Sequence, residues 1–268
     1  MKTGKTVGPA LFLILAVLPL AIYAQPLTEN YLAAVTLAGQ GNFSEAKKIF
    51  QEIIAAEPPH ERAGRCLNVL KDLEDQKIHQ ETASHLFQGL AYFYQDKFPE
   101  AVAAANLALQ INPGYKRAHN SRGGFYFGLG KNDLALADLN RALQLDPEYS
   151  GAYYNRGCVY LKIKQYNRAI ADFGRALKIS PQYASASYNR GIAHFHQGNF
   201  LWALADFTRA LEINPRLAEA YFNRATVLEE LGKDQEAAEA YIKFLQTAYP
   251  ALSREINYAR KRLKVLAK

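Results

Sequence analysis

The chain has 268 residues, of which 49% are apolar and 21% charged, a balance typical of folded proteins that excludes extensive disorder. Its formal charge of +7 is concentrated at the two ends. Residues 253–268 carry six basic side chains and one acidic one, and Lys2 and Lys5 supply the remaining excess. Because a nucleic-acid binder usually spreads basic residues over one face, this distribution argues against DNA or RNA as the partner.

Residues 1–24 have the pattern of an export signal. A short basic start is followed by an apolar run from Val7 to Leu20, and the small residue Ala24 precedes Gln25 at a position suited to cleavage. The run is shorter than a membrane-spanning helix needs and contains two prolines. We therefore expect a cleaved signal peptide and an exported protein, periplasmic or extracellular. An uncleaved membrane anchor is the alternative.

Two segments, 27–60 and 61–81, precede the regular part of the chain. Residues of the first segment have the spacing of the repeat that follows, which predicts a weak helical hairpin: Gly41, Ala46, Phe50 and Pro58. The second segment does not fit that period. Its closely spaced Leu and Val residues between 67 and 73 predict one helix that bridges the hairpin and the repeats.

A pattern of 34 residues repeats between 82 and 251. Three copies of one motif begin at Tyr153, Ser187 and Tyr221 and read YYNRG, SYNRG and YFNRA. Each copy is followed at constant distance by an alanine and then an aromatic residue, and a proline stands near its end. Glycine and alanine let two helices approach closely, whereas a lone helical hairpin would leave its apolar face exposed. The pattern therefore predicts helical hairpins that stack on one another.

This pattern resembles the tetratricopeptide repeat (TPR), a helix–turn–helix unit of 34 residues. The resemblance implies an all-α fold, a right-handed α-solenoid (superhelix) of stacked units. It divides the regular part of the chain into five TPR units: 82–115, 116–149, 150–183, 184–217 and 218–251. Residues 252–268 then form a basic capping helix, with apolar residues on one face and basic residues towards water. Contact of this helix with an acidic lipid or polymer is the alternative.

The resemblance also implies that the first helices of successive units line a concave peptide-binding groove. Asparagine occupies the same place in three units, at Asn155, Asn189 and Asn223. Because an amide both donates and accepts hydrogen bonds, such a row can pair with the backbone of any extended peptide. Further groove residues accompany the row: Tyr154, Tyr188, Phe222, Phe127, Phe195 and Lys162. The alternative is that the repetition copies a packing solution, with the amides bonded locally and the aromatic rings between helices.

Three units combine an arginine in the first helix with an aspartate sixteen residues later in the second. This spacing places the two side chains on facing helices of one hairpin. We therefore expect structural ion pairs, in which breaking one member strands the other. The pairs are Arg122 with Asp138, Arg156 with Asp172, and Arg190 with Asp206.

No pattern in the sequence indicates catalysis, a cofactor or a metal site. There is no glycine-rich phosphate loop and no GxSxG motif, and the pair His194 and His196 points to different faces of a helix. We expect a non-enzymatic scaffold or adaptor that binds extended segments of a partner protein or peptide. The alternatives are a structural, self-associating component of an envelope assembly and an accessory subunit that regulates an enzyme. Any membrane contact would come from the N-terminal segment or the basic C-terminal helix.

Overall fold

The structure, a computed structural model, describes residues 29–56 and 61–266. All regular structure in these residues is helical. The helices are α1 (Glu29–Gly39), α2 (Phe43–Ala56), α3 (Glu61–Glu74), α4 (Gln80–Phe93), α5 (Phe98–Ile111), α6 (Lys116–Gly128), α7 (Asn132–Leu145), α8 (Ser150–Lys162), α9 (Tyr166–Ile179), α10 (Ala184–His196), α11 (Phe200–Ile213), α12 (Ala218–Glu230), α13 (Asp234–Thr247), a 3-10 turn η1 (Pro250–Leu252) and α14 (Ser253–Leu266). The described residues divide into two compact units, one ending at Val159 and one beginning at Tyr160, so the division falls inside α8.

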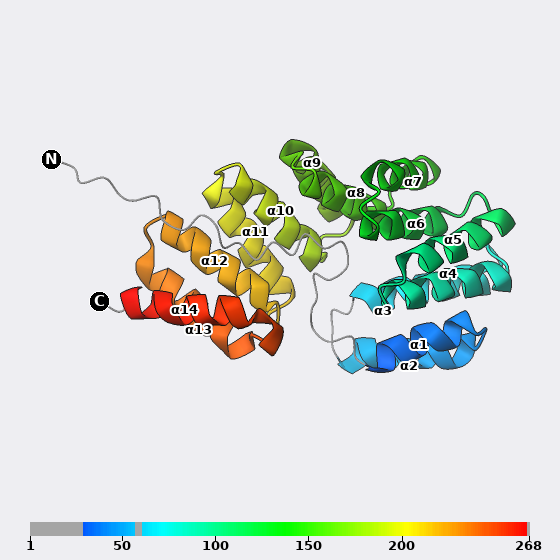
Figure 1. Cartoon of the computed structure of the whole chain (residues 1–268), viewed down its shortest axis with the longest axis horizontal. Helices are drawn as coiled ribbons and strands as arrows, with labels where there is room; N and C mark the ends of the chain where they lie inside the picture. Colours follow the sequence, from blue (N-terminus) through cyan, green and yellow to red (C-terminus); the bar gives the residue numbers. More distant parts are fainter. Residues whose placement is uncertain (1–28, 57–60, 267–268) are drawn as a thin grey trace. The chain divides into compact units, whose positions relative to one another are not determined.

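The unit that ends at Val159 contains the regular hairpins α4–α5 and α6–α7, whose helices lie side by side (Figure 1). α6 also packs on α5, so the second hairpin stacks on the first. Each second helix stops shortly before a proline, as α5 does before Pro113, because the residue that precedes a proline is disfavoured in a helical conformation. The core of each hairpin combines alanines with several large apolar residues, such as Ala135 and Leu139 in α7.

The N-terminal part of this unit departs from the regular alternation. α1 pairs with α2, and α3 packs on α2. Of the helices that precede it, α4 packs mainly on α1 and only slightly on α3. Two contacts show that α1 and α4 run in opposite directions. The hydroxyls of Tyr31 and Tyr94 are 3.2 Å apart, and Gln88 Nε2 donates to the Gly39 carbonyl at 3.1 Å. The additional helix α3 therefore interrupts, along the chain, the regular alternation of first and second helices that begins at α4.

The turns inside the hairpins share one backbone conformation. Gly130, Gly198 and Gly232 have φ values of 72°, 74° and 72°, in the left-handed region that glycine adopts without strain. The corresponding turn residues Asp96 and Lys164 have φ values of 57° and 61° although they carry side chains. The turn geometry is thus the same in all five hairpins between α4 and α13.

In the unit that begins at Tyr160, helices α9 to α13 pack in succession and α14 follows (Figure 1). α14 packs against α13, and its apolar side joins the core around Phe222, Tyr241 and Phe244. It contributes a fully buried Ala259 and the partly buried residues Ile256, Tyr258, Leu263 and Leu266. This helix covers apolar surface at the end of the last hairpin, as a cap does. In the part of the chain that the structure describes, no helix has both the length and the apolar character needed to cross a bilayer.

Candidate functional site

The asparagine row lies on α8, α10 and α12, and two of its amides bond to the first helix of the preceding repeat. Asn155 Nδ2 donates to Asn120 Oδ1 at 2.9 Å, and Asn223 Nδ2 donates to the Tyr188 hydroxyl at 2.9 Å. Each bond joins residues 35 positions apart along the chain, so the same contact between first helices occurs twice. The side chains of Asn189 and Asn223 are buried, while Asn155 is half-buried. The row therefore has a structural role, because two of its three amides link the first helices of neighbouring repeats.

The aromatic residues predicted to accompany the row are buried. Tyr188 and Phe222 are completely inaccessible, and the Tyr188 ring lies 5.7 Å from Phe207 of the partner helix α11. Those predicted to lie in the groove and found in the interior are Tyr154, Tyr188, Phe222, Phe127 and Phe195. Lys162, at the end of α8, is exposed. The expectation of an exposed aromatic surface is thus corrected, because these rings fill space within the helical stack.

The structure brings together two of the three predicted ion pairs. Arg122 donates from Nε to Asp138 Oδ2 and from a terminal nitrogen to Oδ1, both at 2.7 Å. Arg190 makes the same two-pronged contact with Asp206, at 2.9 and 2.6 Å. Both aspartates are buried, and the bidentate geometry gives each carboxylate two charge-assisted hydrogen bonds. The third pair, of Arg156 with Asp172, joins residues of different units and stays a prediction.

Two partners of these arginines escaped the sequence analysis. The remaining terminal nitrogen of Arg122 donates to Asn106 at 2.7 Å, and that of Arg156 donates to Asn140 at 2.7 Å. Each acceptor lies sixteen residues earlier, on the second helix of the preceding hairpin. At the corresponding place before Arg190 the chain has Gly174, which has no side chain to accept. The sequence contained a sign of these bonds, because an asparagine stands sixteen residues before each of the two arginines.

Asp138 also accepts a bond from the first helix of its hairpin. His119 Nδ1 lies 3.0 Å from Asp138 Oδ1, and its Nε2 lies 3.0 Å from the Pro113 carbonyl oxygen. Burial alone would raise the pKa of Asp138, but the bonds from Arg122 and His119 outweigh burial and lower it. The cluster therefore keeps a charged carboxylate between the two helices.

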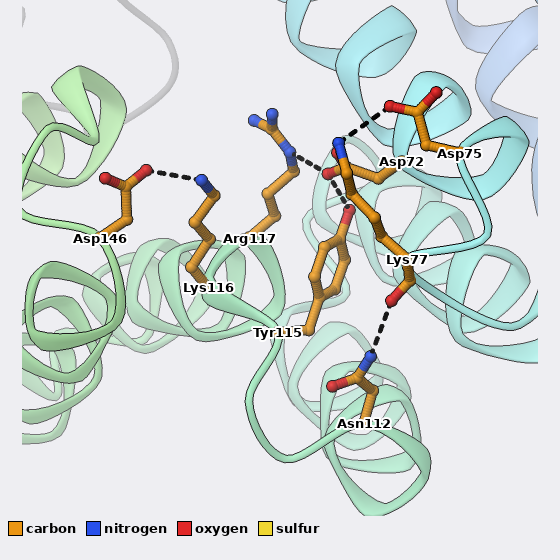
Figure 2. Close-up of polar contacts among 8 residues, drawn as sticks. All are labelled: Asp72, Asp75, Lys77, Asn112, Tyr115, Lys116, Arg117 and Asp146. Atoms are coloured by element: carbon orange, nitrogen blue, oxygen red, sulfur yellow. Dashed lines mark hydrogen bonds and ion pairs between the residues drawn. The ribbon is translucent and has the colours of Figure 1, made fainter.

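A second polar cluster fixes the irregular helix α3 to the start of α6 (Figure 2). Asp72 of α3 accepts from the Tyr115 hydroxyl at 3.0 Å and from Arg117 Nε at 2.7 Å. Burial and the nearby carboxylate raise the pKa of Tyr115, so the phenol stays a donor. Lys116, the neighbour of Arg117, points the other way to Asp146 at 2.5 Å. The bonds of Asp72 to Tyr115 and Arg117, which the sequence did not predict, hold the non-repeating helix α3 in place.

Two of the three acidic residues of α12, Glu219 and Glu229, have partners from the C-terminal segment. Arg262 of α14 donates from Nε to Glu229 Oε2 at 2.8 Å, and a terminal nitrogen of the same side chain lies 2.5 Å from this oxygen. Glu219, in the first turn of α12, accepts from the Tyr249 hydroxyl at 2.5 Å. Burial raises the pKa of Glu219, and the bond from Tyr249 only partly opposes this. These acids bind the cap to the last hairpin and are not a ligand-facing charge cluster.

Nothing in the described residues resembles a metal centre. Across residues 29–56 and 61–266, no three His, Cys, Asp or Glu side chains gather in an arrangement that could hold an ion. The polar contacts described above link one helix to another.

Comparisons with known proteins agree on the fold. Models of the tetratricopeptide repeat match residues 30–60, 150–183, 184–217 and 207–239, and a model of the TPR repeat matches 123–164. Two of these matches have the bounds of units expected from the sequence. No curated protein sequence matches the chain.

Solved structures are similar at low sequence identity, which shows the fold alone. Pseudomonas aeruginosa PilF is 18% identical with a TM-score of 0.61, covering 70% of this chain and 89% of its own. MamA from Desulfovibrio magneticus RS-1 is 19% identical with a TM-score of 0.56, covering 63% and 96%. YrrB, a TPR protein with an unusual peptide-binding site, is 20% identical with a TM-score of 0.53, covering 72% and 97%. With repeat matches over more than half of its length and helices that follow the 34-residue period, this chain belongs to the tetratricopeptide repeat family.

Proposed function

We propose that this protein is a scaffold that holds extended segments of other polypeptides along the first helices of its repeats. The TPR fold supports a protein-interaction role in general, and a peptide-binding site is reported for the similar protein YrrB. The apolar run from Val7 to Leu20 supports action outside the cytoplasm, in the periplasm or an extracellular space.

The observation that carries the proposal is the amide pair of Asn155 and Asn120. Asn155 is half-buried, and only its Nδ2 is used in the bond to Asn120. An amide oxygen has two lone pairs, and Asn120 Nδ2 carries further donor hydrogens. A peptide backbone offers the complementary donor and acceptor at every residue. Bound in this way, a segment would be held by its backbone, so recognition would tolerate different side chains.

The test is binding of unstructured peptides to the full chain and to a variant with Asn155→Ala. The best binder from a library of unstructured peptides serves as the probe, with affinity measured by fluorescence anisotropy. Asn155 is the half-buried member of the row, and one lost backbone bond is worth about 1 kcal/mol, so we expect the affinity to fall about fivefold. The loss should be similar for peptides of different sequence.

A matched control separates the row from asparagines in general. Asn68 and Asn257 are exposed and lie on α3 and α14, away from the row. A variant with both changed to alanine should bind as the parent does. Unchanged peptide affinity of the Asn155→Ala variant would contradict the proposal, and its melting temperature shows whether the fold is kept.

Self-association is the second candidate, favoured by an exposed apolar pair. Leu201 and Trp202 on α11 are 69% and 67% exposed, and the corresponding places on α9 hold Asn167 and Arg168. Large apolar side chains in contact on a surface often mark an interface. Sedimentation velocity over a range of concentrations tests this role. A dimer that Leu201→Asn with Trp202→Arg abolishes would support it, and a monomer at all concentrations would contradict it.

A further inference from the structure

The capping helix α14 has two sides with different chemistry. Its apolar side is already occupied, because Ala259 and its partly buried apolar neighbours pack into the core of the last hairpin. The bond of Arg262 to Glu229 fixes the rotation of the helix about its axis. α14 therefore cannot roll over to bring its apolar side to another surface without losing the cap.

The opposite side is basic. Arg254, Arg260, Lys261 and Lys264 are all exposed, and none has an ion-pair partner within the described residues. At 3.6 residues per turn these four positions fall within about a third of the circumference of the helix. We call them the basic face. Among the described residues Ser253–Leu266, only Ser253, Asn257 and Val265 share this side, so its charge is of one sign.

The acidic residue of α14 does not neutralise the basic face. Glu255 is half-buried on the other side of the helix, where its charge acts on Glu219 and Tyr249. The fixed orientation that the cap requires therefore also presents four flexible cations to the solvent in a line of about 15 Å, at 1.5 Å per residue.

We infer that the basic face of α14 binds the surface of an anionic phospholipid membrane. The cations lie on a convex helix and not in a pocket, so they fit an extended array of charges better than a single anion. Clusters of four or more Lys and Arg residues on an amphipathic helix are typical of contacts with acidic headgroups. Val265, 55% exposed beside Lys261 and Lys264, adds an apolar side chain that can enter the headgroup layer. The inference goes beyond peptide binding and does not depend on it.

A nucleic acid fits this face less well. Single-stranded nucleic acids are bound by aromatic side chains on which bases stack, together with cations. The aromatic residue of α14, Tyr258, points inward and contacts the rings of Phe222 and Tyr241 at 5.7 and 6.3 Å. The basic face thus offers charge and alkyl stems but no stacking platform.

The test is co-sedimentation of the full chain with vesicles of phosphatidylcholine alone or mixed with phosphatidylglycerol. We expect preferential binding to the mixed vesicles that weakens as salt is added. In the variant with Arg254, Arg260, Lys261 and Lys264 changed to Gln, partitioning should fall about fivefold per residue, or several hundred-fold in all. Any contribution of the apolar N-terminal segment is the same in both proteins and is measured with the neutral vesicles.

A control variant changes four exposed lysines outside α14 to Gln: Lys71, Lys97, Lys131 and Lys178. It has the same net charge as the test variant and should partition within about tenfold of the parent, since distant charges are screened. Equal losses in both variants would overturn the inference, and so would the absence of a preference for anionic vesicles. Binding of soluble heparin or nucleic acid without vesicle binding would overturn it in favour of an acidic polymer. Circular dichroism and melting temperatures show whether each variant keeps its cap.

Discussion

The hairpins α6–α7 and α12–α13 share a turn but hold their helices together differently. Their turn glycines, Gly130 and Gly232, both have φ of 72°. In α6–α7, Arg122 makes a bidentate contact with the buried Asp138. In α12–α13 the arginine persists as Arg224, but Ala240 stands where the aspartate would be. The comparison shows that the turn and the helix lengths determine the hairpin geometry. The side-chain contact that joins the two helices can differ from one hairpin to the next.

Aromatic packing replaces the ion pair in the last hairpin. The rings of Phe222 and Phe244 lie 5.2 Å apart, and Phe222 and Tyr241 lie 5.7 Å apart. Phe244 occupies a place that is alanine in α7, where Ala142 belongs to a cluster with Ala152 of the following helix. α13 can hold a large side chain at this place because the next helix is the cap α14, whose Tyr258 adds a further ring.

Truncating Phe244 should have the largest effect on stability. The side chain is completely buried, so Phe244→Ala loses its apolar burial and leaves a cavity, at a cost of about 4 kcal/mol. Urea unfolding of the full chain, followed by circular dichroism, measures the change. Ile242→Ala on the same helix is the control, because Ile242 is 47% exposed and should cost less than about 1 kcal/mol. Equal shifts for the two variants would mean that the aromatic cluster does not hold the hairpin.

The sequence predicted the regular parts of the molecule better than the irregular ones. A 34-residue period constrains every unit at several positions, so the helices, their turns and the places of Arg122 and Asp138 followed from spacing. The link between Asp72 and Arg117 could not be found in this way, because it joins a non-repeating helix to a repeat over a distance that occurs once. The exposure of Tyr188 and Phe222 was also misjudged, since a period shows which residues correspond but not how closely neighbouring helices cover them.

Breaking the ion pair of α6–α7 should have the next largest effect. Asp138→Ala leaves Arg122 and His119 without their buried acceptor, and we expect a loss of about 3 kcal/mol in the free energy of unfolding. Changing Arg122 and Asp138 together to alanine should cost less than the sum of the single changes, because neither partner is stranded. Asp133→Ala, exposed in the first turn of the same helix, is the control, with about 0.5 kcal/mol. Additive effects of the two single changes would refute the coupling.

Gly123 tests the close approach of the two helices in α6–α7. A Cβ at this position would lie 2.8 Å from Leu139 Cγ and 3.2 Å from the Ala135 carbonyl oxygen. Gly123→Ala should therefore destabilise by about 1–2 kcal/mol, despite the better helix propensity of alanine. Gly64→Ala in α3 is the matched control, because no atom lies within 4 Å of its Cβ position and the change should stabilise by about 0.5–1 kcal/mol. The same sign for both substitutions would show that steric contact does not matter at Gly123.

The smallest effects should appear in the pH dependence, with opposite signs in the two hairpins. The bonds from Arg122 and His119 lower the pKa of Asp138 below its ordinary value of 3.8, although burial opposes them. Its contribution to stability is present above that value and is lost as the pH falls through the lower, folded-state pKa. The advantage of the parent over Asp138→Asn should therefore shrink in acid.

Glu219 of α12 should behave in the reverse way. Burial raises its pKa above the ordinary value of 4.5, so the folded state binds a proton more tightly than the unfolded state does. The resulting stabilisation is complete below pH 4.5 and is lost as the pH rises through the folded-state pKa. Relative to Glu219→Gln, the parent should gain stability as the pH falls from neutral to 4.5. Urea midpoints of both variants and the parent, measured from neutral pH down to about pH 2, give the two differences. If both changed in the same direction, the contrast between a paired carboxylate and a buried one would be wrong.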